Sequence, residues 1–223
     1  MEINDYVKKY DPQNQFDVLI NSYQQIEFAW NNQFTIDGIK SSEIANIIIS
    51  GLGGSAISAD LIKNYFSSEI EIPIIVNRNY NLPKFANKNT LFIASSYSGN
   101  TVETISALKQ AIELDCKIVC ITTGGEVEAI AKNKNIPCIK VQPGFQPRYS
   151  LGLSFFSLLK VFQELKLISD QTKIIENVIS LWKQKGIEYS GVGNYAYTFA
   201  ELFVGFIPII YSVAVCSCVV GFW

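Results

Sequence analysis

The sequence predicts an α/β fold with a doubly wound, parallel, five-stranded sheet and helices on both faces. Short apolar runs alternate with helical patterns between residues 46 and 165, an arrangement typical of a parallel sheet. The first run, Asn46–Ser50, leads at once into a glycine-rich turn and a helical pattern. Hydrophobic residues make up 48% of the chain, which is enough for a packed core.

Composition and charge exclude several classes of function. The chain has 223 residues and a formal net charge of −2, so it carries no strongly basic composition and we expect no nucleic-acid partner. Met1–Tyr6 lacks the positive flank and apolar core of a signal peptide, which predicts a cytoplasmic protein.

Cysteine and histidine content argues against a metal site. The five cysteines show no ligand spacing, and the chain contains no histidine. A Cys/His zinc site and a Cys–His or Ser–His catalytic pair are therefore excluded within one chain, and we expect no metal. Cys120 and Cys138 lie in apolar, strand-like runs and are interpreted as small buried hydrophobic residues.

The elements are expected in a simple order. Residues 1–45 should form a helical segment that packs on the sheet domain, because residues 13–31 place apolar side chains at helical spacing. The sheet domain should cover residues 46–165. Its strands are expected at 46–50, 72–77, 90–95, 117–122 and 137–141, and its helices at 56–66, 101–114, 126–134 and 151–167.

The first glycine turn, Gly51-Leu52-Gly53-Gly54-Ser55, has the features of an anion site. Backbone N–H groups and the positive end of the following helix point at one spot. Glycine suits such a turn because a Cβ would hold the anion away from the backbone. We predict a phosphate cradle that contains Gly53, Gly54 and Ser55.

A second polar turn, Ser95–Thr104, follows the third expected strand and contains Ser96, Ser98 and Thr101. Helix capping alone could explain such a cluster. However, the carboxyl ends of parallel strands lie at one edge of the sheet, so two such turns favour one shared phosphate site. Ser96, Ser98 and Thr101 therefore join the predicted phosphate ligands.

The first turn also satisfies the dinucleotide-binding fingerprint, as Gly51-x-Gly53-x-x-Ala56. NAD is disfavoured, because Asn77-Arg78-Asn79 stands where an acidic residue should hold a ribose hydroxyl. An NADP-binding alternative stays open through Arg78, but it gives the second turn no role. We predict that no cofactor binds.

Arg148 precedes the helix expected at 151–167, a position where the helix dipole disfavours a cation. It is therefore either directed at an anionic ligand or a solvated surface arginine.

Together these motifs resemble the sugar isomerase (SIS) superfamily, and within it the bifunctional phosphoglucose/phosphomannose isomerases. The resemblance covers residues 10–165 and continues more weakly further on. The matching motifs are Gly51–Ser55, Ser96–Thr104, Thr122–Gly125 and Pro147-Arg148, then Asn194–Ala196 and Ile207–Tyr211.

The resemblance implies a homodimeric enzyme that converts glucose 6-phosphate or mannose 6-phosphate to fructose 6-phosphate through a cis-enediol. It implies that Ser55, Ser96, Ser98 and Thr101 hold the phosphate of the sugar 6-phosphate. It also implies that Arg148 is a catalytic residue that stabilises the enediolate. In that family a glutamate base and a histidine from the other subunit complete the site.

The sequence departs from this pattern at its C-terminal end. The family's base and histidine lie in a second domain, and Glu103, Glu126 and Glu128 do not match the base position. Residues 166–223 are expected to be a linker helix and the truncated start of a second SIS domain. Little or no isomerase activity is expected of such a chain.

Residues 202–223 carry no charge, which meets the length rule for a membrane helix. Gly205, Pro208 and the many β-branched residues favour a strand of the incomplete domain over a membrane helix. We therefore expect that the chain does not bind a membrane. The functions left open are a sugar-phosphate isomerase, a non-catalytic sugar-phosphate-binding SIS module, an NADP-binding Rossmann-type domain and a membrane-anchored domain.

Overall fold

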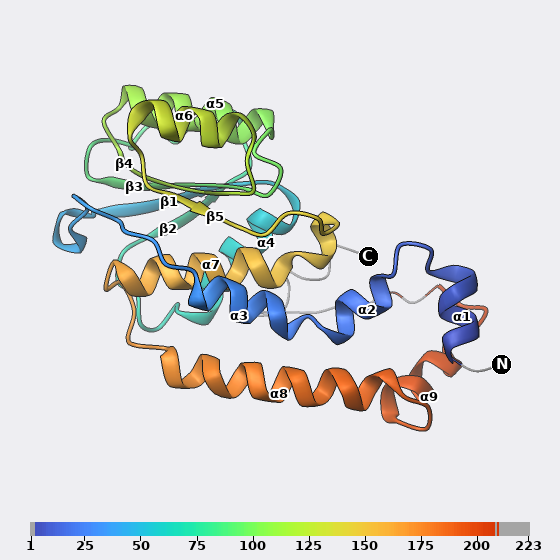
Figure 1. Cartoon of the computed structure of the whole chain (residues 1–223). Helices are drawn as coiled ribbons and strands as arrows, with labels where there is room; N and C mark the ends of the chain where they lie inside the picture. The colour runs from blue at the N-terminus through green and yellow to red at the C-terminus, as the bar shows by residue number, and fades with distance from the viewer. Residues whose placement is uncertain (1–2, 208, 210–223) are drawn as a thin grey trace.

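A single parallel sheet organises the chain (Figure 1). The computed structural model describes residues 3–207 and 209. The strands lie in the order β2-β1-β3-β4-β5, and every pair is parallel. The predicted five-stranded α/β fold is therefore confirmed. The strands are β1 (Asn46–Ser50), β2 (Ile74–Asn77), β3 (Thr90–Ser96), β4 (Lys117–Thr122) and β5 (Cys138–Lys140).

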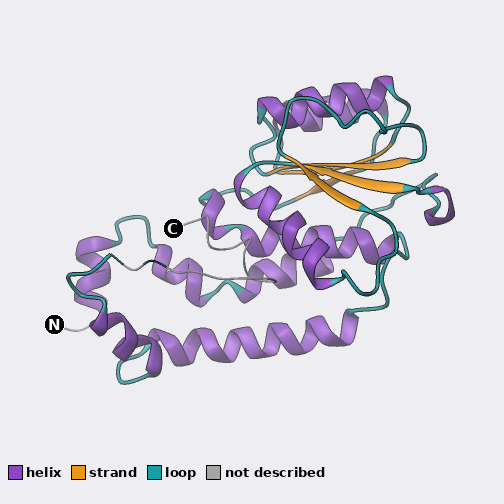
Figure 2. Ribbon diagram, turned by 180° about the vertical axis from the view of Figure 1, so that it is seen from behind, coloured by secondary structure: helices purple, strands orange, loops and turns teal. Residues whose placement is uncertain are grey.

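Helices cover both faces of this sheet (Figures 1 and 2). One face carries α5 (Val102–Glu113) and α6 (Gly125–Lys134), and the other carries α4 (Gly53–Tyr65), α7 (Leu151–Glu164) and α3 (Tyr23–Asn31). The long helix α8 (Thr172–Ser190) lies outside α3 and forms a further layer. The remaining elements are α1 (Ile3–Tyr10), α2 (Gln15–Ile20), α9 (Tyr195–Leu202), and the 3-10 turns η1 (Ser41–Glu43) and η2 (Pro147–Tyr149).

Because helices cover both faces of the sheet (Figure 1), its strands are continuous apolar runs and do not alternate between apolar and polar residues. Along β1, Ile47 and Ile49 enter the core under α4 and α7, whereas Ile48 enters the core under α5 and α6. All three are completely buried, as is every residue of β3 to within a few per cent. A strand whose two faces are both buried is mainly apolar along its length instead of alternating with polar residues.

The predicted helix over 13–31 forms two helices, α2 and α3. The break lies at Ser22, whose hydroxyl donates to the Leu19 carbonyl at 2.7 Å. Serine and asparagine offer the backbone such local alternatives, which interrupt a helix. After the break, α3 still buries Ile26 and Trp30 in the core that contains Leu153 of α7.

Two further boundaries differ for local reasons. The strand predicted from residue 72 begins at Ile74, because Pro73 has no N–H for the ladder. The helix predicted to residue 167 ends at Glu164, where Lys166 adopts φ +56° and the Leu167 N–H bonds to the Phe162 carbonyl at 2.9 Å. That pair of features is a common helix stop.

The C-terminal region begins with two helices. Asn194 caps α9 by accepting a hydrogen bond from the Tyr197 N–H at 2.8 Å. The strand expected from Ile207 to Tyr211, and most of the uncharged stretch 202–223, lie outside the described residues. Within the described ranges 3–207 and 209, no helix is both long enough and apolar enough to cross a bilayer. The domain boundaries given above stay predictions.

Candidate functional site: a phosphate cradle at the strand switch point

The two polar turns meet at the carboxyl edge of the sheet. β1 and β3 are neighbours, with Ser50 opposite Ala94, and the chain continues from β1 to a strand on its other side. Loops that follow such neighbouring strands diverge and leave a crevice, where ligands of open α/β sheets bind. This strand order is the flavodoxin type and differs from that of the dinucleotide-binding folds.

A cavity of about 230 Å³ occupies this crevice. Five of the six predicted phosphate ligands line it, namely Gly53, Gly54, Ser55, Ser98 and Thr101. Its other lining residues are Leu52, Tyr97, Pro147, Ser150 and Ser154. The structure therefore brings the two turns together with a third segment, the start of α7.

Ser96, the sixth predicted ligand, lies behind the cavity wall. It is 2% exposed, its Oγ is 2.9 Å from Oγ1 of Thr101, and the same Oγ accepts the Gly99 N–H at 3.1 Å. Ser96 thus holds the loop and Thr101 in place. Thr101 is also the N-cap residue of α5, yet its side chain makes no capping bond. Capping therefore does not account for this cluster.

The first turn places the N-terminus of α4 at the cavity, which Leu52, Gly53, Gly54 and Ser55 line. α4 begins at Gly53, which adopts φ +54°, and the residue before it makes no side-chain cap. The first N–H groups of a helix have no partner within the helix, so they are free to bind an anion. Gly51 allows this geometry, because a Cβ there would lie 2.7 Å from the Ser95 carbonyl oxygen.

The motif Thr122–Gly125 supports the second turn from the next loop along the sheet. The Thr123 hydroxyl donates to the Tyr97 carbonyl at 2.7 Å, and the Val127 N–H bonds to the Gly99 carbonyl at 3.0 Å. The Asn100 side chain accepts the Glu126 N–H at 3.0 Å. These bonds fix the loop that carries Ser98.

Tyr97 ties the second turn to the segment between β5 and α7. Its hydroxyl donates to the Gln142 carbonyl at 3.1 Å and accepts the Phe145 N–H at 2.9 Å. Burial raises the pKa of Tyr97, so the phenol stays protonated and keeps both bonds.

Arg148 lies in η2, between cavity-lining Pro147 and Ser150. Its side chain is exposed and does not itself line the cavity. Within residues 3–207 and 209 it forms no ion pair. Arg148 thus carries a cation without an ion pair in the described part of the chain, directly after cavity-lining Pro147.

Gln25 of α3 is a site-supporting residue that sequence reasoning missed. It is 2% exposed, its Nε2 donates to the Tyr149 carbonyl at 2.6 Å, and its Oε1 accepts the Leu153 N–H at 3.3 Å. These bonds join α3 to both η2 and the first turn of α7. The sequence feature that could have indicated this role is a glutamine on the apolar face of the helix predicted over 13–31.

The three carboxylates weighed in the sequence, Glu103, Glu126 and Glu128, interact with side chains outside the cradle. Glu103 lies beside Tyr80 and raises the pKa of that phenol. Glu126 pairs with Lys109 at 2.8 Å, and Glu128 pairs with two lysines. Among the residues that the structure describes, no carboxylate lines the cradle.

Arg78 is also occupied, since it pairs with Asp60 of α4. The anchor on which the NADP alternative depended is therefore an ion pair at the helix surface. As for metals, no group of three or more histidine, cysteine or acidic side chains gathers within the described ranges.

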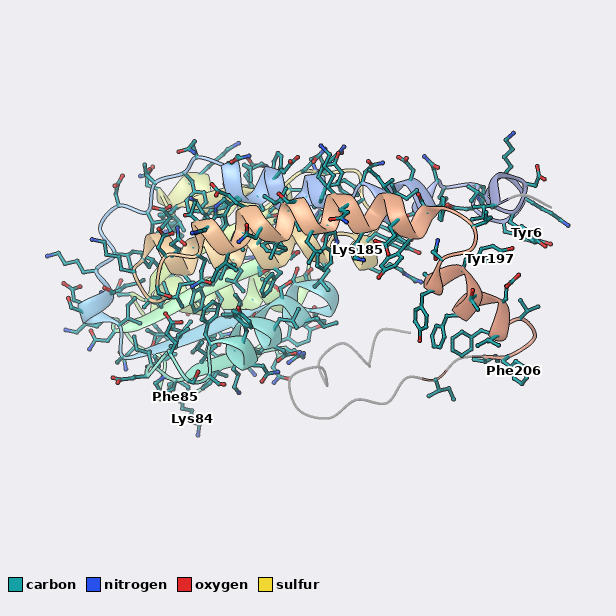
Figure 3. All side chains as sticks on the ribbon, turned by 90° about the horizontal axis from the view of Figure 1, so that it is seen from below. Tyr6, Lys84, Phe85, Lys185, Tyr197 and Phe206 are labelled. Atoms are coloured by element: carbon teal, nitrogen blue, oxygen red, sulfur yellow. The ribbon has the colours of Figure 1, made fainter. Side chains whose placement is uncertain are left out.

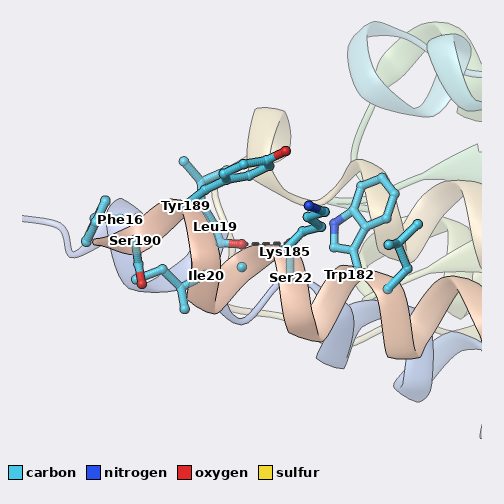
Figure 4. A pocket seen from close by; sticks show the side chains of 10 residues that line it. Phe16, Leu19, Ile20, Ser22, Trp182, Lys185, Tyr189 and Ser190 are labelled. Carbon is cyan, nitrogen blue, oxygen red and sulfur yellow. Dashed lines mark hydrogen bonds between the residues drawn. The ribbon is translucent and has the colours of Figure 1, made fainter. Parts of the chain in front are cut away.

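A second, larger cavity of about 460 Å³ lies between α2 and the C-terminal half of α8 (Figure 4). Its lining is mainly apolar, with Phe16, Leu19 and Trp182 among its members. Lys185 is the charged residue of this lining and pairs with Glu188 at 2.7 Å. Its other polar members are Ser22, Tyr189 and Ser190, and the hydroxyls of Ser22 and Ser190 already donate to the carbonyls of Leu19 and Ile187. The cavity also lies away from the carboxyl edge of the sheet, where ligands of open α/β sheets bind.

The structure defines an α/β domain with a parallel sheet of order β2-β1-β3-β4-β5 and a polar cavity at the β1/β3 switch point. The family model of the SIS domain matches residues 41–163. The chain therefore belongs to the SIS domain family, and the resemblance seen in its motifs is confirmed.

Individual relatives agree with this assignment. The bifunctional phosphoglucose/phosphomannose isomerase of Caldicellulosiruptor bescii is 40% identical over 74% of this chain and 49% of its own length. Its namesake from Aquifex aeolicus is 34% identical over 90% of this chain and 61% of its own length. The chain thus spans about half the length of the curated relatives it matches.

A solved structure supports the fold alone. The C-terminal domain of glucosamine-fructose-6-phosphate aminotransferase from Francisella tularensis superposes with a TM-score of 0.57 at 14% identity. The superposition covers 81% of this chain and 56% of that one.

Proposed function

We propose that this chain binds a hexose 6-phosphate and forms the phosphate-binding part of an aldose–ketose isomerase. The substrates are glucose 6-phosphate or mannose 6-phosphate on one side and fructose 6-phosphate on the other. The observation that carries this proposal is the meeting of the β1 and β3 turns in one cavity of about 230 Å³. The family resemblance supports a homodimer, and the N-terminal sequence, which lacks the features of a signal peptide, supports a cytoplasmic location.

In this proposal the phosphate lies between the N-termini of α4 and α5. Ser55, Ser98 and Thr101 donate to its oxygens, and Ser96 orients Thr101. Ser98 is suited to this role, because its Oγ accepts the Asn100 N–H at 3.2 Å and leaves its own proton to donate. Neutral donors and helix dipoles suffice for a phosphate, so no lysine is needed.

Arg148 at the rim stabilises the negative charge of the enediolate, a role for a preorganised cation. The proton transfer itself needs a base within about 3 Å of the substrate hydrogen. Because no carboxylate is among the described residues that line the cradle, we propose that the base comes from residues outside that lining.

A non-catalytic sugar-phosphate-binding module is the second candidate. The observation that favours it is the absence of a carboxylate from the cradle in the described part of the chain. The two functions share the phosphate site and differ only in turnover.

Binding is tested by titration calorimetry with fructose 6-phosphate. Ser98→Ala should weaken binding by about 1–3 kcal/mol, the contribution of a hydrogen bond to a charged group. Ser180→Ala, an exposed serine of α8, is the matched control and should bind like the original protein. If Ser98→Ala and the original chain bind equally well, the phosphate does not lie in this cradle.

Turnover separates the two candidates. The chain is assayed with fructose 6-phosphate in a coupled glucose 6-phosphate readout, and Arg148→Ala is the control. We expect no turnover above background, because the described cradle contains no base. Activity that Arg148→Ala abolishes would place the base within these 223 residues.

A further inference from the structure

Ser154 is a cavity-lining residue to which neither the motifs nor the proposed ligand set gives a role. It lies on α7, is 5% exposed, and lines the cradle. The two large neighbours that follow it, Phe155 and Phe156, pack against the hydrophobic core. A hydroxyl at this apolar helix surface therefore needs an explanation.

Ser154 differs from other buried serines in its hydrogen bonding. Ser58 donates to the Gly54 carbonyl at 2.9 Å, and Ser150 donates to the Pro147 carbonyl at 2.9 Å. Within residues 3–207 and 209, the Ser154 hydroxyl has no such partner. The Ser154 oxygen is not among the fully enclosed, unpartnered side-chain atoms of the described residues, so it opens into the cavity and is available to a ligand.

Ser55 has the same combination of properties. It is 6% exposed, lines the same cavity, and its hydroxyl also lacks a partner in the described part of the chain. Ser55 lies on α4 and Ser154 lies on α7, and these two helices pack side by side on one face of the sheet. Ser98, by contrast, is exposed at the outer side of the cradle.

We propose that the Ser154 hydroxyl donates a hydrogen bond to an oxygen of the ligand's phosphate group. The ligand class is a phosphate monoester, which offers several charged acceptors to donors converging from α4, the β3–α5 turn and α7. Depth supports the phosphate over the sugar, because Ser154 is as deeply buried as Ser55 at the α4 N-terminus. This inference rests on the proposed phosphate site and extends it to a third wall.

Ser157 provides a matched control on the same helix. Its Oγ is fully enclosed and has no partner within the described residues, and it does not line the cradle. Ser154→Ala and Ser157→Ala thus remove the same chemical group from the same helix. Only the first removal should affect a ligand.

The test is titration calorimetry of the full chain with inorganic phosphate and with fructose 6-phosphate, alongside thermal unfolding. Ser154→Ala should bind both ligands about tenfold more weakly, since a hydrogen bond to a charged group is lost. Its Tm should stay the same or rise. Ser157→Ala should bind both ligands as the original chain does. Ser154→Cys, with a weak donor of similar size, should share the loss.

Each outcome decides between the two proposals. If Ser154→Ala and Ser154→Cys bind phosphate unchanged while Ser98→Ala is weakened, the Ser154 assignment fails and the phosphate site stands. If Ser154→Ala weakens the binding of fructose 6-phosphate but not of inorganic phosphate, Ser154 contacts the sugar, and its assignment to the phosphate group is wrong. If the original chain binds neither ligand, both proposals fall.

Discussion

At the scale of single residues, the cradle depends on the close approach of Gly51, which directly follows β1, to the backbone of Ser95 near the end of β3. A Cβ at Gly51 would come within 2.7 Å of the Ser95 carbonyl oxygen and 3.0 Å of the Ser55 Cβ. The position thus accepts only glycine, because the opposing atoms are strand backbone and a proposed ligand residue rather than a flexible side chain.

Gly51→Ala should therefore both destabilise the protein and weaken phosphate binding. Overpacking of this kind lowers the free energy of unfolding by about 1–3 kcal/mol. The added methyl group would also displace Ser55, whose Cβ lies 3.0 Å from its position. Urea unfolding measures the first effect and calorimetry the second. Gly191→Ala is the control, since a Cβ there meets nothing within 4 Å and the backbone φ is −89°. Equal stability of Gly51→Ala and the original chain would contradict the close approach.

At the scale of elements, the N-terminal helix α3 determines where the third wall of the cradle lies. Its Gln25 bonds to the backbone on both sides of Ser150, at Tyr149 and Leu153. Gly152 makes room for this contact, because a Cβ there would lie 2.9 Å from Oε1 of Gln25. α3 is thus a support for η2 and α7 as well as a cover for the sheet.

Gln25→Met keeps the side-chain volume but removes both hydrogen bonds. We expect a loss of about 1–3 kcal/mol in the free energy of unfolding, because buried backbone groups lose their partners. Fructose 6-phosphate binding should weaken as η2 shifts. Gln24→Met, at the neighbouring exposed position, should change neither quantity. A Gln25→Met protein with full stability and affinity would show that α3 only covers the core.

At the scale of the whole molecule, the C-terminal elements present apolar surface to solvent. Figure 3 shows α9 and the following turn projecting from the end of α8. Their side chains are strongly exposed, with Val204 at 78%, Phe206 at 74% and Ile207 at 90%. Contiguous exposed apolar surface of this kind promotes association.

We expect the 223-residue chain to form assemblies larger than a dimer, as measured by light scattering. A shortened chain that ends at Ser190 keeps α8 and removes the exposed apolar residues of α9 and the turn that follows it, so its association should fall. Its affinity for fructose 6-phosphate should not change, because the cradle lies wholly within residues 52–154. If the 223-residue chain remains monomeric or dimeric in light scattering, this prediction is wrong.

Local chemistry explains what could be predicted from the sequence. The strands and the two turns follow from apolar runs, glycines and hydroxyls that are close in the chain. The family follows from the same short motifs. For this reason the sequence predicts the sheet and the two turns. Five of the six proposed ligands indeed line one cavity.

Only the tertiary structure decided which side chains face the cradle. Ser96 belongs to the motif but turns toward Thr101, whereas Ser154 belongs to no motif and lines the cavity. Gln25 meets residues more than 120 positions away. Such contacts depend on the strand order and on how α3, α4 and α7 pack. The periodicity of a helix tells which residues share a face, but not which neighbour that face meets.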